Sequence, residues 1–166
     1  MSNCCSSNNH KQQDASVAVC RSCGIKGKAV ATLTVKQLVT DHTRVAADKS
    51  YSFCRTPSCD VVYFAPGCVF RKPGIKVRVG LKEKADPAPL CYCFGYTRED
   101  IRRDVEQSSA SDIPQRIKSE IQAGFCACEI KNPSGTCCLG DITRTIQEFQ
   151  ETLLPTRRRA VNTAAY

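Results

Sequence analysis

The chain has 166 residues, of which 42% are apolar, so it is long enough for one ordinary domain or two small ones. It has thirteen cysteines and no tryptophan, a composition typical of a scaffold held by disulfides or metal ions. The odd cysteine count excludes complete disulfide pairing, and no apolar run reaches the roughly 20 residues of a membrane helix. The formal charge of +8 would fall to about +4 with two four-thiolate metal centres, so it does not by itself indicate nucleic-acid binding.

The polar residues 1–16 predict a flexible tail. Its Cys4, Cys5 and His10 could bind a soft metal ion, although a tail with incidental thiols is the simpler interpretation. The chain shows no basic-then-apolar export leader, and cysteine pairs in a reducing cytosol are more often metal ligands than disulfides. We therefore expect a cytoplasmic protein.

Two cysteine pairs are separated by about thirty residues, a spacing that predicts a structural zinc site. The first is Cys20-Arg-Ser-Cys23, followed by a glycine that allows a tight turn, and the second is Cys54 with Cys59 around a proline-containing turn. No βαβ pattern follows Cys20, which argues against a thioredoxin-like redox pair. Such a closed four-cysteine site would stabilise a fold rather than catalyse a reaction.

Strand patterns surround these pairs and predict a small antiparallel sheet in a β-rich zinc-binding domain, residues 17–85. We expect strands over residues 29–35, 61–64 and 74–80, and a short helix over residues 35–39. Cys68 belongs to neither pair and is best interpreted as a lone buried thiol. The charged, proline-rich residues 82–89 predict the domain junction.

Residues 86–155 have helical patterns and predict a second, helical domain. Thr97 is a candidate N-cap for a first helix, and Asp112 precedes a second helix that has Pro114 in its first turn and ends at Gly124. A third helix is expected from about Asp141 to Leu154, with the following proline ending it and residues 156–166 forming a basic tail. The predicted fold class is thus α+β.

The helical domain contains thiols in a pattern suited to a [2Fe–2S] cluster, which needs two thiolates for each iron. Cys91-Tyr-Cys93 would supply one pair from a tight loop, and two helices then return the chain to the same end of the bundle. Cys138 is preferred over Cys137, because it lies where the third helix begins and the helix dipole favours an anionic cluster. Between Cys126 and Cys128 the spacing does not decide.

From Cys20 to about Phe149 the sequence resembles the N-terminal domain of CopZ-type copper chaperones, a zinc and [2Fe–2S] module. The helical part is also similar to the bacterioferritin-associated ferredoxin domain. The resemblance implies zinc ligands and cluster ligands in two sets of four. The matching motifs are Cys20-Arg-Ser-Cys23, Phe53-Cys54, Cys59-Asp-Val-Val-Tyr-Phe64, Cys91-Tyr-Cys93, Cys128 and Asn132-Pro-Ser-Gly-Thr-Cys137-Cys138. The implied zinc ligands are Cys20, Cys23, Cys54 and Cys59, and the implied cluster ligands are Cys91, Cys93, Cys128 and Cys138.

The resemblance implies reduction of copper(II) to copper(I) and its transfer to a transport protein. CopZ-type chaperones continue into a domain with a Met-x-Cys-x-x-Cys copper loop, whereas the only methionine here is Met1, so electron transfer is implied more directly than copper delivery. The remaining candidates for a copper(I) or other soft-metal cargo site are Cys4, Cys5, His10, Cys68, Cys126 and Cys137.

We therefore expect an iron–sulfur electron-transfer protein linked to metal handling, with a redox partner or a metal-transport protein. The alternative is a metal or cluster carrier without a redox role. A zinc-ribbon nucleic-acid binder is disfavoured, because the chain lacks a stripe of interleaved aromatic and basic residues. The sequence favours a protein that is not an enzyme, since its only histidines are His10 and His42 and it has no phosphate-binding glycine loop. Outer-sphere reduction of a metal ion is the one activity left open.

Overall fold

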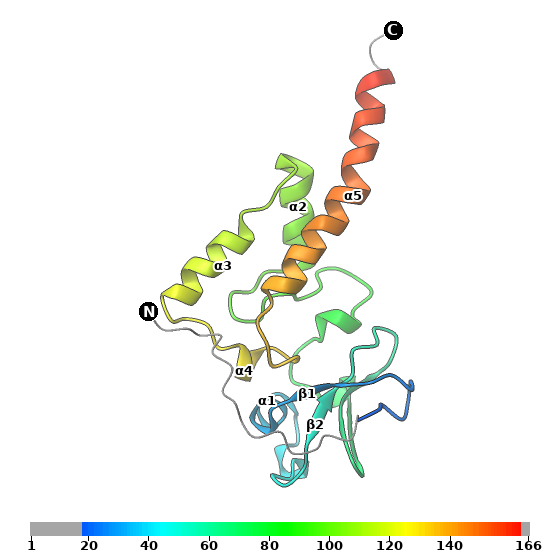
Figure 1. Ribbon diagram of the computed structural model, residues 1–166, viewed down its shortest axis with the longest axis vertical. Helices are drawn as coiled ribbons and strands as arrows, with labels where there is room; N and C mark the ends of the chain where they lie inside the picture. Colours follow the sequence, from blue (N-terminus) through cyan, green and yellow to red (C-terminus); the bar gives the residue numbers. More distant parts are fainter. Residues whose placement is uncertain (1–17, 164–166) are drawn as a thin grey trace.

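The computed structural model describes residues 18–163, in which a small β-sheet with one short helix lies at one end and the longer helices rise from it (Figure 1). Three short 3-10 turns (His42–Arg44, Lys72–Gly74 and Gly80–Lys82) lie between the regular elements. In chain order the strands and helices are β1 (Lys28–Val30), α1 (Thr32–Leu38), β2 (Tyr51–Phe53), β3 (Val61–Ala65), β4 (Cys68–Arg71), α2 (Arg98–Ser108), α3 (Ile113–Gln122), α4 (Cys128–Lys131) and α5 (Leu139–Thr163).

The four strands form one antiparallel sheet in the order β1-β2-β3-β4, so every strand pairs with its sequence neighbour. β3 is buried along its whole length, as its run of β-branched and aromatic residues predicts for a central strand. Val35 and Leu38 of α1, and Val39 directly after it, belong to a core shared with the aromatic residues of the sheet. The strands are only three to five residues long, too short for their backbone hydrogen bonds alone to stabilise the sheet. Burial of these apolar side chains therefore supplies most of its stability.

The helical half forms a second core in which isoleucines of three helices meet. Ile101 and Val105 of α2, Ile117 of α3 and Ile142 of α5 are fully buried there. α2 begins as predicted, because the Thr97 hydroxyl accepts a hydrogen bond from the Asp100 amide while the Asp100 carboxylate accepts one from the Thr97 amide. The antiparallel sheet followed by helices confirms the α+β fold class.

Several predicted boundaries were wrong. Only residues 28–30 form the first strand, and the residues after them belong to α1, because Val35 faces the core with helical rather than alternating periodicity. Residues 74–80 do not form a strand; a single bridge at Ile75 lies between two 3-10 turns instead. The fourth strand is β4, and it contains the buried Cys68.

The last helix is longer than expected. α5 extends through Pro155 to Thr163, whereas the sequence pattern placed its end at that proline. A proline removes one backbone hydrogen bond and favours a kink, but it does not by itself end a helix. None of the helices within residues 18–163 combines the length and apolar character of a membrane span. The predicted N-terminal tail with Cys4, Cys5 and His10 lies outside the described residues.

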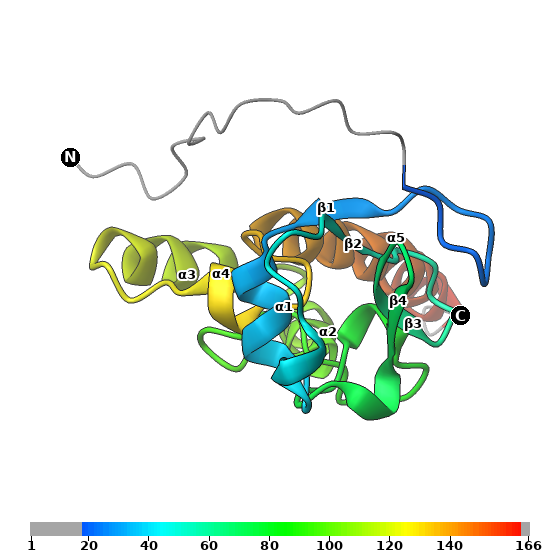
Figure 2. The same cartoon turned by 90° about the horizontal axis from the view of Figure 1, so that it is seen from below.

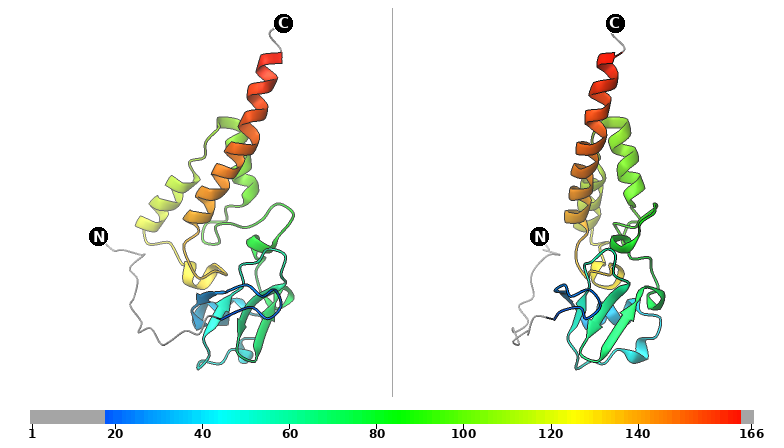
Figure 3. Two further views of the ribbon diagram at one scale, coloured as in Figure 1. Left: turned by 45° about the vertical axis from the view of Figure 1, so that its right-hand side comes forward. Right: turned by 90° about the vertical axis from the view of Figure 1, so that its right-hand side faces the viewer.

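The loop that contains α4 makes the packing contact between the sheet half and the helical half, and it lies between the sheet and α5 (Figure 3). α1 and α4 lie side by side when the molecule is seen from below (Figure 2). The Thr34 hydroxyl donates to the Glu129 carbonyl at 2.6 Å, and the buried Tyr63 hydroxyl donates to the Pro133 carbonyl at 2.8 Å. Gly135 has a φ of 67°, and an added Cβ would lie 3.1 Å from Val30. The loop therefore rests directly on the sheet half.

Candidate metal centres

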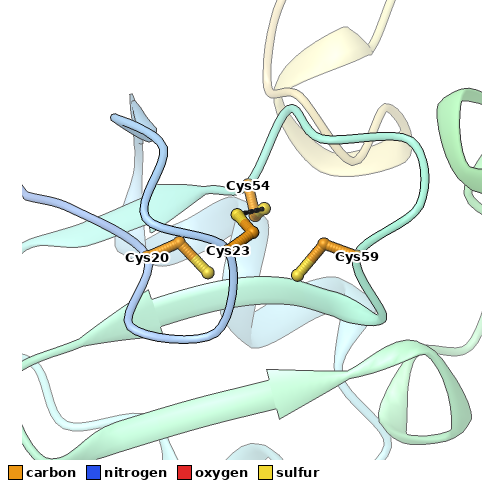
Figure 4. Close-up of side chains that lie close together, drawn as sticks. All are labelled: Cys20, Cys23, Cys54 and Cys59. Carbon is orange, nitrogen blue, oxygen red and sulfur yellow. Dashed lines mark hydrogen bonds between the residues drawn. The ribbon is translucent and has the colours of Figure 1, made fainter.

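Four thiols gather at one edge of the sheet, and all four sulfurs lie within 4.8 Å of one another. They come from two loops that face each other, one ahead of β1 and one between β2 and β3 (Figure 4). The thiols are those of Cys20, Cys23, Cys54 and Cys59. In the first loop the Gly24 amide donates to the Cys20 carbonyl at 2.8 Å, and the φ of 73° at Gly24 is the left-handed conformation that this turn requires.

The spacing of these sulfurs fits a tetrahedral metal ion. Sulfurs each about 2.3 Å from a zinc ion lie about 3.8 Å apart, and the Cys23 and Cys54 sulfurs are 3.6 Å apart. A hydrogen bond from the Thr56 hydroxyl lowers the pKa of the Cys23 thiol to about 6, which favours the thiolate form that binds metals. Burial raises the pKa of the Cys54 thiol to about 11, so a bound cation is needed to hold it as a thiolate at neutral pH.

A buried lysine supports the second of these loops. Lys82 is only 4% exposed, and its ammonium donates to the carbonyls of Thr56 and Cys59 at 2.9 and 3.0 Å. The ammonium also lies 5.9 Å from the centre of the Phe53 ring. Within the described part of the chain its partners are carbonyls and a ring rather than a carboxylate. A four-thiolate zinc site, with a charge of about −2, would supply the missing negative charge.

A second group of thiols lies where the helical half meets the α4 loop. The Cys91 and Cys138 thiols are hydrogen-bonded to each other, and both are almost fully buried. Beside them the Cys93 sulfur lies 3.7 Å from the Cys128 sulfur and accepts a hydrogen bond from the Ala127 amide at 3.3 Å. The group therefore consists of a buried pair and a half-exposed pair.

Each half of this group comes from a structured turn. A hydrogen bond from the Gly95 amide to the Cys91 carbonyl closes the Cys91-Tyr-Cys93 turn. Cys138 immediately precedes α5, where free amides and the helix dipole favour negative charge. The hydrogen bond from the Cys138 thiol lowers the pKa of Cys91 to about 6, while the same contact and burial raise the pKa of Cys138. Burial likewise raises the pKa values of Cys93 and Cys128.

The structure thus gathers the four predicted zinc-site cysteines in one group, and it places the four predicted cluster cysteines as a buried pair, Cys91 with Cys138, and a half-exposed pair, Cys93 with Cys128. It also places the Cys126 sulfur 3.4 Å from that of Cys128, so three thiols cluster at the half-exposed end. Cys68 and Cys137 lie outside both groups, and Cys68 instead donates weakly to the Arg44 carbonyl. All cysteines within residues 18–163 are free of disulfides. Sequence reasoning missed Lys82, because a lysine in a charged, proline-rich stretch gives no signal of burial.

Comparisons with known proteins relate the chain to one family. The zf_CopZ family, described as a zinc binding domain, matches residues 17–76. The copper chaperone CopZ of Archaeoglobus fulgidus is 35% identical over 119 residues, which cover 72% of this chain and 57% of that chaperone. The X-ray structure of its N-terminal domain matches with a TM-score of 0.63 at 33% identity, covering 76% of this chain and 96% of that domain. The chain therefore spans little more than half the length of the chaperone and nearly all of its N-terminal domain.

Proposed function

This chain belongs to the family of the CopZ N-terminal domain, and from that premise we propose that it is an electron-transfer protein in the handling of copper or another soft metal ion. It would hold one structural zinc ion and one [2Fe–2S] cluster in its two groups of thiols. Its partners would be a redox protein or a metal-transport protein, in a reducing compartment such as the cytoplasm.

The zinc ion is assigned to Cys20, Cys23, Cys54 and Cys59. Four mutually close thiols, three of them buried, leave no open position for a substrate, which is the arrangement of a structural site. The Thr56 hydroxyl and the Lys82 ammonium would stabilise the negative charge of the four thiolates. The role of this site is to fix the two loops and thereby the sheet half, proposed as residues 17–85.

The [2Fe–2S] cluster is assigned to Cys91, Cys93, Cys128 and Cys138, in the helical half proposed as residues 86–155. The two thiol pairs match the requirement of two thiolates for each iron. When bound, the cluster supplies one-electron redox chemistry. The chain contributes the buried environment of Cys91 and Cys138, which excludes water, and the Ala127 amide, which donates to the Cys93 sulfur and would favour the reduced form.

The single observation that carries the proposal is the gradient of exposure across the second thiol group. Cys91 and Cys138 are 1% and 2% exposed, whereas Cys93 and Cys128 are half-buried and reach the surface. A purely structural site would be closed on all sides, but electron transfer to a partner or to a metal ion needs one accessible edge. The half-exposed pair provides that edge.

A carrier that passes on its metal or cluster without a redox role is the second candidate. The third thiol at the exposed end, Cys126, favours it, because extra soft ligands at an accessible edge suit transfer of soft metal ions. The two functions differ in what moves: electrons in the first case and metal in the second.

Spectroscopy of the purified full chain tests the proposal. We expect about two iron and two sulfide ions for each zinc ion, a visible spectrum that bleaches with dithionite, and recovery of the colour when copper(II) is added as the oxidant. Loss of iron to an acceptor protein without any redox change would favour the carrier. A protein that contains zinc but neither iron nor sulfide would contradict both.

A further inference from the structure

The half-exposed end of the second thiol group holds three sulfurs, although a [2Fe–2S] cluster needs only two there. Cys93, Cys126 and Cys128 all lie within 4.8 Å of one another, while Cys91 and Cys138 form the buried pair. We propose that Cys126 and Cys128 are interchangeable ligands of the same iron, so that either one completes the site together with Cys93. This inference rests on the proposed function, because it concerns the cluster assigned there.

The geometry makes the two thiols nearly equivalent. Their sulfurs are 3.4 Å apart, on residues separated only by Ala127, and both side chains are half-buried. The Ala127 amide donates to the Cys93 sulfur, so the middle of this loop is anchored to the ligand that the two thiols would share. The iron would thus have two possible sulfur donors on the same side, and a small movement of the loop would exchange one sulfur for the other.

Cys137 does not compete in the same way. It is also half-buried and lies next to a proposed ligand, but its sulfur belongs to neither group of close thiols in the described part of the chain. The exposed end therefore offers a choice between Cys126 and Cys128 in which Cys137 takes no part. This difference makes Cys137 a matched control, a neighbouring thiol without the proposed ligand role.

Exchange between the two thiols is a ligand substitution without oxidation or reduction. As the Cys126 sulfur binds iron it releases its proton, and the departing Cys128 sulfur takes up one proton, so charge and electrons balance. The site keeps four thiolates throughout. One consequence is that loss or chemical modification of a single thiol at the exposed end would leave the cluster in place.

Alanine variants of the full chain test this, because alanine cannot replace a thiolate. We expect Cys126→Ala and Cys128→Ala each to retain at least about half of the wild-type iron and sulfide, with a shifted visible circular dichroism spectrum for Cys128→Ala. The double variant should lose nearly all of both, and Cys137→Ala should match the wild type. Equal zinc content in all variants shows that the sheet half is intact.

A cluster-free Cys128→Ala protein with normal zinc, or a double variant that keeps its cluster, would overturn the inference while leaving the proposed function standing. A wild-type protein without iron and sulfide would instead overturn the proposed function. Brief alkylation of the loaded wild type provides a readout that does not depend on any variant. Mass spectrometry should find a label on Cys126 or on Cys128 but not on both in one molecule, whereas labelling confined to Cys126 would contradict interchange.

Discussion

The two thiol groups are built in different ways. In the sheet group, each loop lies directly beside the strands that support it, and the four sulfurs meet without help from the rest of the molecule. In the second group, the sulfurs come from a turn, from the α4 loop and from the residue before α5. The α4 loop is in turn held by side chains of the sheet half, including Thr34 and Tyr63.

This difference indicates a one-way dependence. The sheet half contains its own core and its own thiol group, so we expect it to keep its fold when the second group is empty. The second group needs the sheet half, because Thr34, Tyr63 and Lys28 donate hydrogen bonds to three separate residues of the loop that carries Cys128 and Cys138. Each prediction below tests either this dependence or one of the contacts behind it.

The largest effect is expected from substitution of a sheet-group thiol. Cys20→Ser or Cys59→Ser removes one of four thiolates from a site whose zinc binding contributes about 10–16 kcal/mol, comparable with the whole stability of a domain. We expect loss of the cooperative thermal transition, measured by circular dichroism. Cys91→Ser is the matched comparison, since it should remove iron and colour while the zinc and the sheet signal remain. Equal global unfolding by both classes would contradict the proposed division into two halves.

Chelation extends the same test to the unmodified protein. Removal of zinc under reducing conditions should release the iron as well, because the loop contacts of Thr34 and Tyr63 are lost with the sheet half. Removal of iron should leave zinc bound. Metal analysis of the protein after each treatment measures both, and independent loss of the two metals would show that the inter-half contacts have no effect on metal retention.

A smaller effect is expected from Lys82→Met, which keeps the length of the side chain but removes its charge. The ammonium makes two hydrogen bonds to the loop of Cys54 and Cys59, and charge-assisted hydrogen bonds contribute about 1.5–3 kcal/mol, equivalent to roughly tenfold to hundredfold weaker zinc binding. Competition with a chromogenic chelator measures the affinity. Lys84→Met is the control, because that lysine is exposed and only two residues away. Equal zinc affinities of the two variants would show that the Lys82 ammonium does not strengthen zinc binding.

The smallest effect is expected from Tyr63→Phe, which deletes one hydroxyl at the contact between the halves. The Pro133 carbonyl would lose its donor, with an expected cost of about 1 kcal/mol and faster loss of iron to a chelator. Tyr51→Phe serves as the control, because its hydroxyl accepts from the Ala46 amide within the sheet half. The control should be destabilised to a similar extent without faster iron loss. If both variants lost iron at the same rate, the contact would not be specific to the second site.

Local signals predicted much of this structure. The N-cap at Thr97, the start of α3 after Asp112 and the strand over residues 61–64 are set by residues close in sequence, and each was found where the pattern placed it. The cysteine spacing likewise indicated that Cys20, Cys23, Cys54 and Cys59 would lie together. These features depend on side-chain periodicity and turn chemistry, which the sequence carries directly.

The features that the sequence did not predict depend on tertiary contacts. Lys82 is buried only because the junction folds back against the loop of Cys54 and Cys59. β4 formed because residues 68–71 pair with β3 across a tight turn, although their pattern is short. The Cys126 sulfur lies 3.4 Å from that of Cys128, and spacing alone could not distinguish the two thiols as ligands.

Electron paramagnetic resonance of the dithionite-reduced full chain, combined with zinc, iron and sulfide analysis of the same sample, tests the central claim most directly. The account predicts one zinc ion and one [2Fe–2S] cluster for each chain, with a signal of one unpaired electron for each cluster. Zinc in both thiol groups, with no signal on reduction, would contradict it.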